Sequence, residues 1–274
     1  MRKLIGISLI LFSFVAVQAQ SGGDYLKNSV FQVGETARYN LYFNWGFIWI
    51  HAGNVDFSVQ TKKLNGKTVH SLKVIGYTIK SFEKMYTIKD TFEAFVDTAR
   101  LLPVYYREVK HENKYYACNQ YFYNRSNKDS TLVYMDFARK RRQWQDTIKI
   151  GNNVTDLITT CYKIRNLDIS KLWKDQTVSF PMLLDDKVYD VGLKYRGKET
   201  IKLRTGGKYN AHKFTPKLVT GDLFKKEDDM TIYVSDDANH VPLLIEAKIT
   251  VGSIKAVLSE IKNTKTPMSS FISK

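Results

Sequence analysis

The sequence predicts a mainly β protein, in which a curved antiparallel sheet forms a barrel or half-barrel and carries one central helix. Apolar residues recur at every second position through most of the chain, which is the period of a half-buried strand. Turn residues separate these runs at regular, short spacing. Only residues 154–166 carry apolar side chains at steps of three and four. About a dozen short strands with one helix favour a sheet that curls on itself.

The alternating runs define the expected strands. In residues 36–45, Tyr39 and Leu41 fall on one face of the strand, and Arg38 and Asn40 fall on the other. The other expected strands cover residues 53–60, 68–79, 88–97, 102–110, 114–124, 130–137, 176–183, 188–203, 207–219, 228–236, 241–252 and 253–262.

Three short stretches predict hairpin turns. Asn65-Gly66 is the strongest of them, because both residues tolerate the positive φ angles of a two-residue turn. Residues 205–210 contain two adjacent glycines and lack the strand–loop–helix context of a phosphate-binding loop. A further turn is expected near residues 196–198, which divides the run 188–203 into two strands.

Two segments share the same turn residues. Asp97 stands six positions before Pro103, and Asp236 stands six positions before Pro242. An aspartate carboxylate accepts hydrogen bonds from turn amides, and proline suits the first residue of a strand because it cannot donate to a ladder. Each pair therefore predicts a hairpin. The two hairpins occupy related places in two similar half-sheets, or the pattern recurs by chance.

The expected helix covers residues 154–166, and Asn153 or Thr155 can cap its start. Asp156 and Arg165 lie on opposite sides of this helix at about 100° per residue, so they cannot pair with each other. Each needs a partner elsewhere, and the sheet is the expected source. Arg165 is therefore a candidate anchor between helix and sheet, or a candidate ligand-binding residue.

The first 19 residues read as a secretory signal peptide. A short basic start precedes the apolar run 4–17, and cleavage is expected after Ala19. A membrane anchor is the alternative, but a spanning helix needs roughly 20 apolar residues. We expect an exported protein, periplasmic or extracellular, whose residues 20–274 form a single domain. A division at the helix is the alternative to one domain.

The formal net charge of +15 indicates a partner with negative charge or a basic, solvated surface. Nucleic acid is not expected for an exported protein, whereas a lipid, a lipoprotein, an anionic envelope glycan or the membrane surface is. The densest basic run is a candidate ligand-binding cluster, with a solvated turn as the alternative. It consists of Arg139, Lys140, Arg141 and Arg142.

The sequence shows no sign of catalytic or metal chemistry. The five histidines lack the spacing of zinc sites, no Gly-x-Ser-x-Gly motif occurs, and no cofactor is expected. The acidic doublets read as turns, because adjacent residues of an extended segment point to opposite faces. Cys118 and Cys161 could form a disulfide worth roughly 3–4 kcal/mol, or could be two buried thiols.

Three stretches resemble a bacterial exported family, domain of unknown function 3108. They are "GETARYNLYFNWGFIWIHAG" at 34–53, "DLITTCYKIRNLDI" at 156–169 and "IYVSDDANHVPLLIEAKITVGSIKAVL" at 232–258. The resemblance implies no established activity. The last stretch is also similar to lipoprotein-carrier-like half-barrels, which implies a curved sheet around an apolar cavity closed by helices. This chain has one clear helix, fewer than such carriers use as a lid.

These observations together predict a non-enzymatic protein of the cell envelope. Its concave sheet would bind an apolar or amphipathic ligand or an envelope partner by burying apolar surface, with basic residues at the rim to orient an anionic head group. The alternative is a structural or assembly factor with a filled core and no small ligand. An envelope enzyme is the least supported of the three hypotheses.

Overall fold

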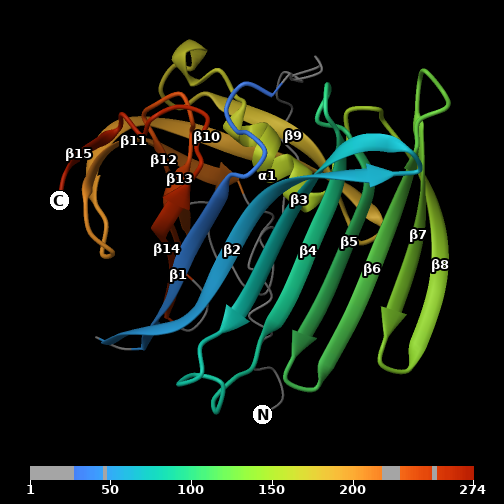
Figure 1. The fold of residues 1–274 in the computed structure, drawn as a ribbon, viewed down its shortest axis with the longest axis horizontal. Helices are drawn as coiled ribbons and strands as arrows, with labels where there is room; N and C mark the ends of the chain where they lie inside the picture. The colour runs from blue at the N-terminus through green and yellow to red at the C-terminus, as the bar shows by residue number, and fades with distance from the viewer. Residues whose placement is uncertain (1–27, 46–47, 218–228, 249–251) are drawn as a thin grey trace.

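A single open sheet forms most of the structure (Figure 1). The structure is a computed structural model, and it describes residues 28–45, 48–217, 229–248 and 252–274. The predicted signal peptide lies outside these residues. Fourteen strands follow one another in the order β8-β7-β6-β5-β4-β3-β2-β1-β14-β13-β12-β11-β10-β9, and β15 pairs with β11. All strand pairs are antiparallel, and the sheet curves around a concave face without closing. The predicted class, a mainly β half-barrel with one helix, is confirmed.

The strand bounds follow the predicted alternation closely. The first half of the sheet contains β1 (Thr36–Trp45), β2 (Ile48–Leu64), β3 (Lys67–Thr78), β4 (Lys89–Asp97), β5 (Pro103–Glu112), β6 (Tyr115–Asn124), β7 (Thr131–Arg139) and β8 (Arg142–Ile150). The second half contains β9 (Thr177–Leu184), β10 (Lys187–Lys202), β11 (Lys208–Lys217), β12 (Met230–Ser235), β13 (Pro242–Lys248), β14 (Ser253–Lys262) and β15 (Phe271–Ser273).

The two halves meet at β1, which pairs with β2 on one side and with β14 on the other. The chain then reaches the far edge through the segment before the helix. The amide of Thr155 donates to the carbonyl of Pro181 at 3.2 Å, and the amide of Leu183 donates to the carbonyl of Thr155 at 2.8 Å. The turn after β9 extends over the concave face, where Asn119 of β6 donates to Asp185 at 3.2 Å. These contacts link the β9 side of the sheet to the segment before α1 and to β6, whereas β8 and β9 remain at opposite ends of the strand order.

The predicted turns are confirmed in two cases and wrong in one. Asn65 and Gly66 have φ angles of 49° and 77° and join β2 to β3. The glycines within residues 205–210 lie in the turn between β10 and β11. No hairpin forms at residues 196–198, because β10 runs through them and a bulge between Tyr195 and Gly197 takes up the extra residue. A glycine at this place in the sequence suggests a turn, because turns often need a positive φ. Here the φ of Gly197, 101°, belongs to the bulge instead.

Both Asp-to-Pro segments are hairpins, as predicted. Asp97 ends β4 and accepts hydrogen bonds from two turn amides, and Pro103 begins β5. In the second hairpin the carboxylate that bonds the turn belongs to Asp237, which accepts from the amide of Asn239 at 3.0 Å. Asp236 instead forms an ion pair with Lys198. Both turns lie at the end of the sheet that carries the helix (Figure 1).

The one α-helix in the described part of the chain, α1 (Leu157–Arg165), is shorter than the predicted 154–166. Its cap is neither Asn153 nor Thr155. Asp156 caps the helix, because its Oδ1 accepts from the amide of Thr159 at 2.8 Å and its Oδ2 accepts from the hydroxyl of the same residue at 2.7 Å. A single 3-10 turn, η1 (Ile169–Lys171), follows.

The core lies on the concave face, between the sheet and α1. Aromatic rings fill the part under β5–β8, where Tyr106 stacks on Tyr121 at 5.2 Å and Phe137 stacks on Trp144 at 5.0 Å. Cys118 in β6 is buried and Cys161 in α1 is half-buried, and both are free thiols. No Cys118–Cys161 disulfide is present, and the two side chains pack as small apolar groups.

One buried carboxyl group within this core has a strongly shifted pKa. Asp90 in β4 has no exposed surface, and its Oδ2 has no hydrogen-bond partner among the described residues. Burial and the nearby charge of Glu112 raise its pKa to about 7, and Glu108 adds to the rise. The amide of His111, which donates to Oδ1 at 2.9 Å, and the charge of Lys110 oppose the shift.

The Asp90→Asn variant should therefore lose less stability with rising pH than the wild-type protein. A carboxyl group whose pKa is higher in the folded state stabilises the fold below its unfolded pKa of 3.8, and that contribution is lost as pH rises through about 7. Between pH 4 and pH 8, the free energy of unfolding of wild type should therefore fall by about 1–3 kcal/mol more than that of the variant.

Urea denaturation at several pH values measures this difference. The matched control is Asp146→Asn, because Asp146 lies exposed on β8. Parallel stability curves for wild type and Asp90→Asn across this pH range would contradict the prediction.

Candidate functional site

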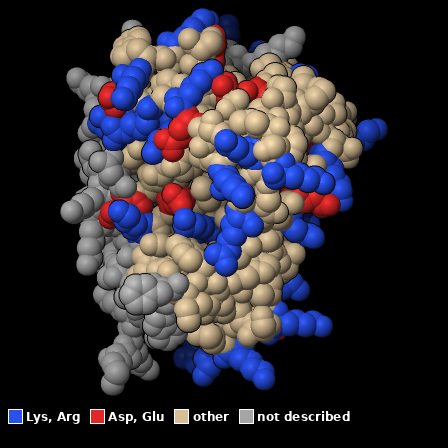
Figure 2. All heavy atoms as spheres, turned by 90° about the vertical axis from the view of Figure 1, so that its left-hand side faces the viewer, with Lys and Arg blue, Asp and Glu red and all other residues tan. Residues whose placement is uncertain are grey.

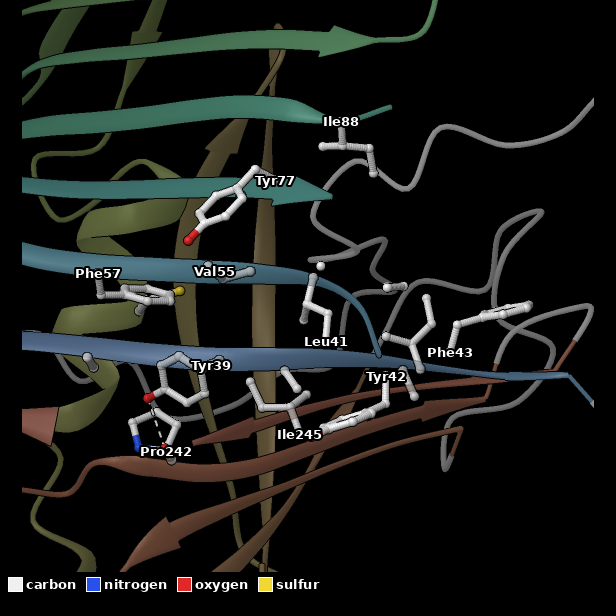
Figure 3. A pocket seen from close by; sticks show the side chains of 18 of the residues that line it. Tyr39, Leu41, Tyr42, Phe43, Val55, Phe57, Tyr77, Ile88, Pro242 and Ile245 are labelled. Atoms are coloured by element: carbon white, nitrogen blue, oxygen red, sulfur yellow. Dashed lines mark hydrogen bonds between the residues drawn. The ribbon is translucent and has the colours of Figure 1, made fainter. Parts of the chain in front are cut away.

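An apolar pocket lies in the concave face where the two halves of the sheet meet (Figure 3). Strands β1, β2 and β3 form one wall, β13 and β14 form the other, and α1 closes one end. The pocket follows β1, whose Tyr39, Leu41 and Phe43 all point into it. A register shift between Leu41 and Tyr42 adds Tyr42 to the same lining. Alternation in β1 therefore supplies the apolar wall, as the sequence indicates, and the register shift adds one further side chain to it.

The cavity volume is about 180 Å³. An apolar protein cavity of roughly 150 Å³ holds one benzene ring, and sites for drug-sized ligands span roughly 300–1,000 Å³. The pocket therefore accommodates one ring or one segment of an alkyl chain, and it is too small to enclose a whole diacyl lipid.

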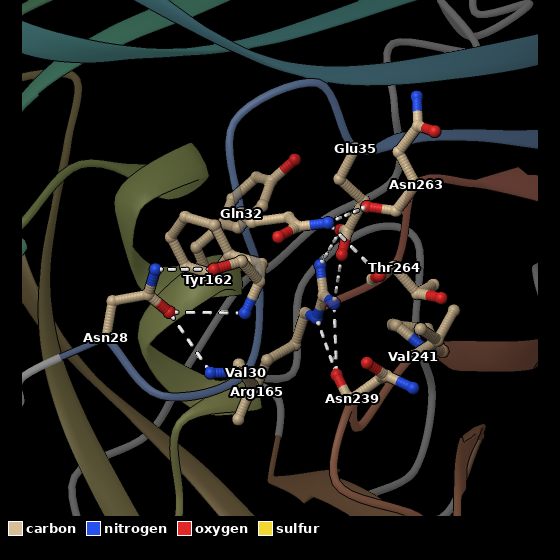
Figure 4. A network of polar contacts seen from close by, with 12 residues as sticks. Asn28, Val30, Gln32, Glu35, Tyr162, Arg165, Asn239, Val241, Asn263 and Thr264 are labelled. Carbon is tan, nitrogen blue, oxygen red and sulfur yellow. Dashed lines mark hydrogen bonds and ion pairs between the residues drawn. The ribbon is translucent and has the colours of Figure 1, made fainter. Parts of the chain in front are cut away.

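A buried ion pair closes the inner end of the pocket (Figure 4). Arg165 at the end of α1 donates from Nη1 to Glu35 at 2.6 Å and from Nη2 to the other carboxylate oxygen at 3.2 Å. Nε and Nη2 also donate to the backbone carbonyl of Asn239. The side chains of Arg165 and Glu35 are only 9% and 3% exposed. The guanidinium thus joins α1, the residue that precedes β1, and the turn between β12 and β13.

These contacts explain the charge state of Arg165. Burial by itself would lower the pKa of the guanidinium, but the hydrogen bonds and the charge of Glu35 outweigh burial and raise the pKa above its ordinary value. Its donors are directed at Glu35 and Asn239, and this geometry is that of an anchor between helix and sheet. The sequence correctly indicates that Arg165 needs a partner outside the helix.

Two phenols and one thiol at the helix end of the pocket are held in neutral form. Burial raises the pKa of Tyr39 and Tyr162 well above the usual value of a phenol. The hydroxyl of Tyr39 donates to the carbonyl of Pro242 at 2.9 Å. Burial also raises the pKa of the Cys161 thiol to about 12, so the reactive thiolate is scarce at neutral pH. The lining favours apolar contact and offers no activated thiol.

The other end of the pocket lies near the loop between β3 and β4. Phe82 and Ile88 of this loop line the pocket together with Phe43 of β1. All three belong to segments that reach the end of the sheet opposite α1 (Figure 1). The pocket therefore runs along β1, from the buried ion pair toward the hairpin turns at that end.

The predicted basic cluster lies elsewhere, at the turn between β7 and β8. Lys140 and Arg141 are exposed in this turn, and the guanidinium groups of Arg139 and Arg142 lie 5.1 and 4.9 Å from the ring of Trp144. The structure does not bring this cluster together with Arg165. The expected basic rim of the pocket is therefore not formed by residues 139–142.

Arg139 belongs instead to a buried polar network on the concave face of β5–β7. Its Nη1 donates to Asn119 at 2.7 Å, and Asn119 donates to Glu108 at 2.7 Å. Lys110 completes an ion pair with Glu108 at 3.2 Å. Because each polar group has a partner here, the network satisfies buried charge in the filled part of the core.

Sequence reasoning missed Glu35, Asn239 and Glu108 as site or core residues. A signal was present for two of them. Glu35 shares the odd-numbered face of Tyr39 and Leu41, so it is an acid on an apolar face. Glu108 shares the face of the buried Tyr106 in the same way. An acid at such a position needs a buried cationic or hydrogen-bonding partner. Asn239 acts mainly through its carbonyl, which no side-chain pattern reveals.

The described residues offer neither a metal site nor a helical membrane span. Among them, no three or more His, Cys, Asp or Glu side chains are placed to hold a metal ion. None of the described helices is long and apolar enough to cross a bilayer.

Fold and pocket together define a half-barrel β protein with an apolar groove closed at one end by a helix. The family model described as "Protein of unknown function (DUF3108)" matches residues 38–259, and the chain belongs to this family. The resemblance drawn from the sequence is thus confirmed. No curated protein matches the chain.

A solved structure shows the same fold. It is a β-barrel-like protein of domain of unknown function DUF1849 from Brucella abortus, with a TM-score of 0.51 and 10% identity. The match covers 86% of this chain and 100% of that one. At this identity the likeness concerns the fold alone.

Replacement of Arg165 should destabilise the protein rather than alter its chemistry. The Arg165→Met variant leaves the buried carboxylate of Glu35 without its cation, and we expect a loss of about 3 kcal/mol in the free energy of unfolding. The double variant Glu35→Leu/Arg165→Met should lose less than the sum of the two single variants, because it removes both charges. Urea denaturation measures all of these changes.

The matched control is Arg38→Met, which breaks the exposed ion pair with Asp56 and should cost less than about 1 kcal/mol. Equal losses for Arg165→Met and Arg38→Met would show that the buried pair does not anchor the helix.

Proposed function

We propose that the protein is an exported, non-enzymatic envelope protein that binds an apolar or amphipathic ligand in the pocket along β1. The observation that supports this proposal is a cavity of about 180 Å³ whose walls are almost wholly apolar. Burial of a ligand in such a cavity is favoured by roughly 25 cal/mol per Å² of apolar surface removed from water.

The size of the cavity narrows the ligand class. One alkyl segment or one ring fits, so the proposed ligand is a single acyl chain, either of a lipid or of a lipoprotein, with the rest of the molecule outside. Glu35 and Arg165 are the charged residues of the described lining, and they are paired with each other. A charged head group would therefore stay near the surface of the protein.

A basic residue is available for such a head group. Arg204, in the turn between β10 and β11, is exposed, and its guanidinium lies 5.0 Å from the ring centre of Tyr42. Tyr42 itself lines the pocket. Arg204 is thus our candidate for orienting an anionic head group, in place of the basic cluster 139–142.

A second candidate function is that of a structural or assembly factor of the envelope without a small ligand. The observation that favours it is again the volume, which lies below the usual range of ligand sites. Native mass spectrometry of the protein purified from its own cells separates the two. A bound lipid supports the first function, and a bound protein without lipid supports the second.

Filling the pocket should weaken binding of a fluorescent 16-carbon fatty acid. In Ala256→Phe a ring would occupy the wall formed by β14, and we expect at least a tenfold loss of affinity in a fluorescence titration, with little change in melting temperature.

The control is Ala99→Phe, which adds the same ring to an exposed turn and should bind like wild type. If wild type shows no saturable binding, or if Ala256→Phe binds as well as Ala99→Phe, the pocket is not a ligand site.

A further inference from the structure

Three described hairpin turns project from the same end of the sheet, opposite α1, where β1 ends and β2 begins. They join β3 to β4, β5 to β6, and β7 to β8 (Figure 1). Antiparallel strands that follow one another in sequence place every second turn at the same end, so this grouping follows from the strand order. We refer to this end as the tip face, and define it by the described residues Ile48, 79–88, 113–115 and 140–142.

The tip face exposes large apolar side chains that contribute little to the core. Ile48, Met85 and Tyr115 are 67, 58 and 50% exposed, and each lies where a different pair of consecutive strands meets. Among the described large apolar residues only Trp173 is as exposed as Ile48. Single exposed apolar residues are common on protein surfaces, but three at one end of the sheet form one patterned surface.

The same turns carry cations without partners. All five of their lysine and arginine side chains that lie outside strands are exposed, and none forms an ion pair or ring contact within the described ranges. Glu83 is the exposed acid among the described residues of these turns. The five cations are Lys80, Lys84, Lys114, Lys140 and Arg141.

Several lysines on the strands differ from these, because each has an acidic partner on the same strand, on the neighbouring strand or, for Lys62 of β2 and Glu93 of β4, on the strand after that. Figure 2 shows Lys and Arg intermixed with Asp and Glu over the upper part of the molecule, and Lys and Arg without acidic neighbours along its lower margin. The pairs are Lys62–Glu93, Lys213–Glu199, Lys255–Glu246 and Lys262–Glu260. Within the described residues, the turns of the tip face thus carry five exposed cations without an acidic partner and one exposed acid, Glu83.

We propose that the tip face docks on the surface of an anionic lipid bilayer. Exposed apolar side chains enter the boundary between head groups and acyl chains, and lysines and arginines beside them attract anionic head groups. The chemistry of the tip face matches both parts of such a surface. An acidic protein surface would match the charge, but it would not favour burial of the exposed apolar side chains of Ile48, Met85 and Tyr115.

Docking in this orientation would place the outer end of the pocket at the membrane. Phe82 and Ile88 line the pocket and flank Met85 in the same loop. A single acyl chain could then pass between bilayer and pocket without crossing water. This last step depends on the proposed ligand-binding function, whereas docking itself does not.

Vesicle flotation tests the docking. The full chain, as isolated from its own cells, is mixed with phosphatidylcholine vesicles that contain or lack 30% phosphatidylglycerol. We expect partition into anionic vesicles to exceed partition into neutral ones. Lys84→Gln/Lys114→Gln/Arg141→Gln should lower it at least about tenfold, since each cation near a bilayer adds about 1 kcal/mol of attraction. Met85→Gln/Tyr115→Gln should weaken the binding that persists in 0.5 M salt, because screening removes the charge contribution.

The matched control is Lys198→Gln/Lys213→Gln/Lys262→Gln, which removes the same net charge from the strand faces. It should bind within about twofold of wild type. Equal loss in the control and the tip variant, or equal binding to neutral and anionic vesicles, would overturn the proposal. The fatty-acid titration of Ala256→Phe measures ligand binding in the pocket independently of vesicle binding. Failure of the docking proposal is therefore distinguishable from failure of the ligand-binding proposal.

Discussion

One buried ion pair holds α1, the one α-helix among the described residues, over the open sheet. Arg165 ends α1, and its guanidinium bonds both Glu35, which precedes β1, and the carbonyl of Asn239 in the β12–β13 turn. These three segments are remote in sequence. An open sheet leaves one end of its groove exposed to water unless another element covers it, so this contact decides whether the groove has a closed end. Removal of either charge would leave the other buried and unpaired.

A closed end and neutral walls together give the groove its chemical character. Tyr39 donates to a backbone carbonyl, and burial keeps its phenol neutral. The thiol of Cys161 is held protonated by the same cause. A pocket of this kind selects by shape and apolar surface. The other half of the concave face is filled by stacked rings such as Tyr106 and Tyr121. Space for a ligand thus exists where the two half-sheets meet, whereas the aromatic half is packed.

The fold could be read from sequence to a large extent because alternation is a local property. A strand with one buried face must alternate, and Asn65-Gly66 fixes a turn through its own backbone preference. Gly197 misled the prediction because a bulge and a turn both require a positive φ, and only the partner strand distinguishes them. The helix cap was misplaced for a similar reason. Asn153, Thr155 and Asp156 can all cap, and the position of the first helical turn decides among them.

Sequence alone determined the antiparallel, curved sheet, the place of the helix and the family, because periodicity and turn chemistry act over a few residues. Only the tertiary structure decided which charges meet. Arg165 lies beside Glu35, 130 positions away, while residues 139–142 lie at a separate turn. Such pairing depends on how the sheet curls and which loops approach the helix. That arrangement results from the packing of the whole chain and leaves no short-range pattern.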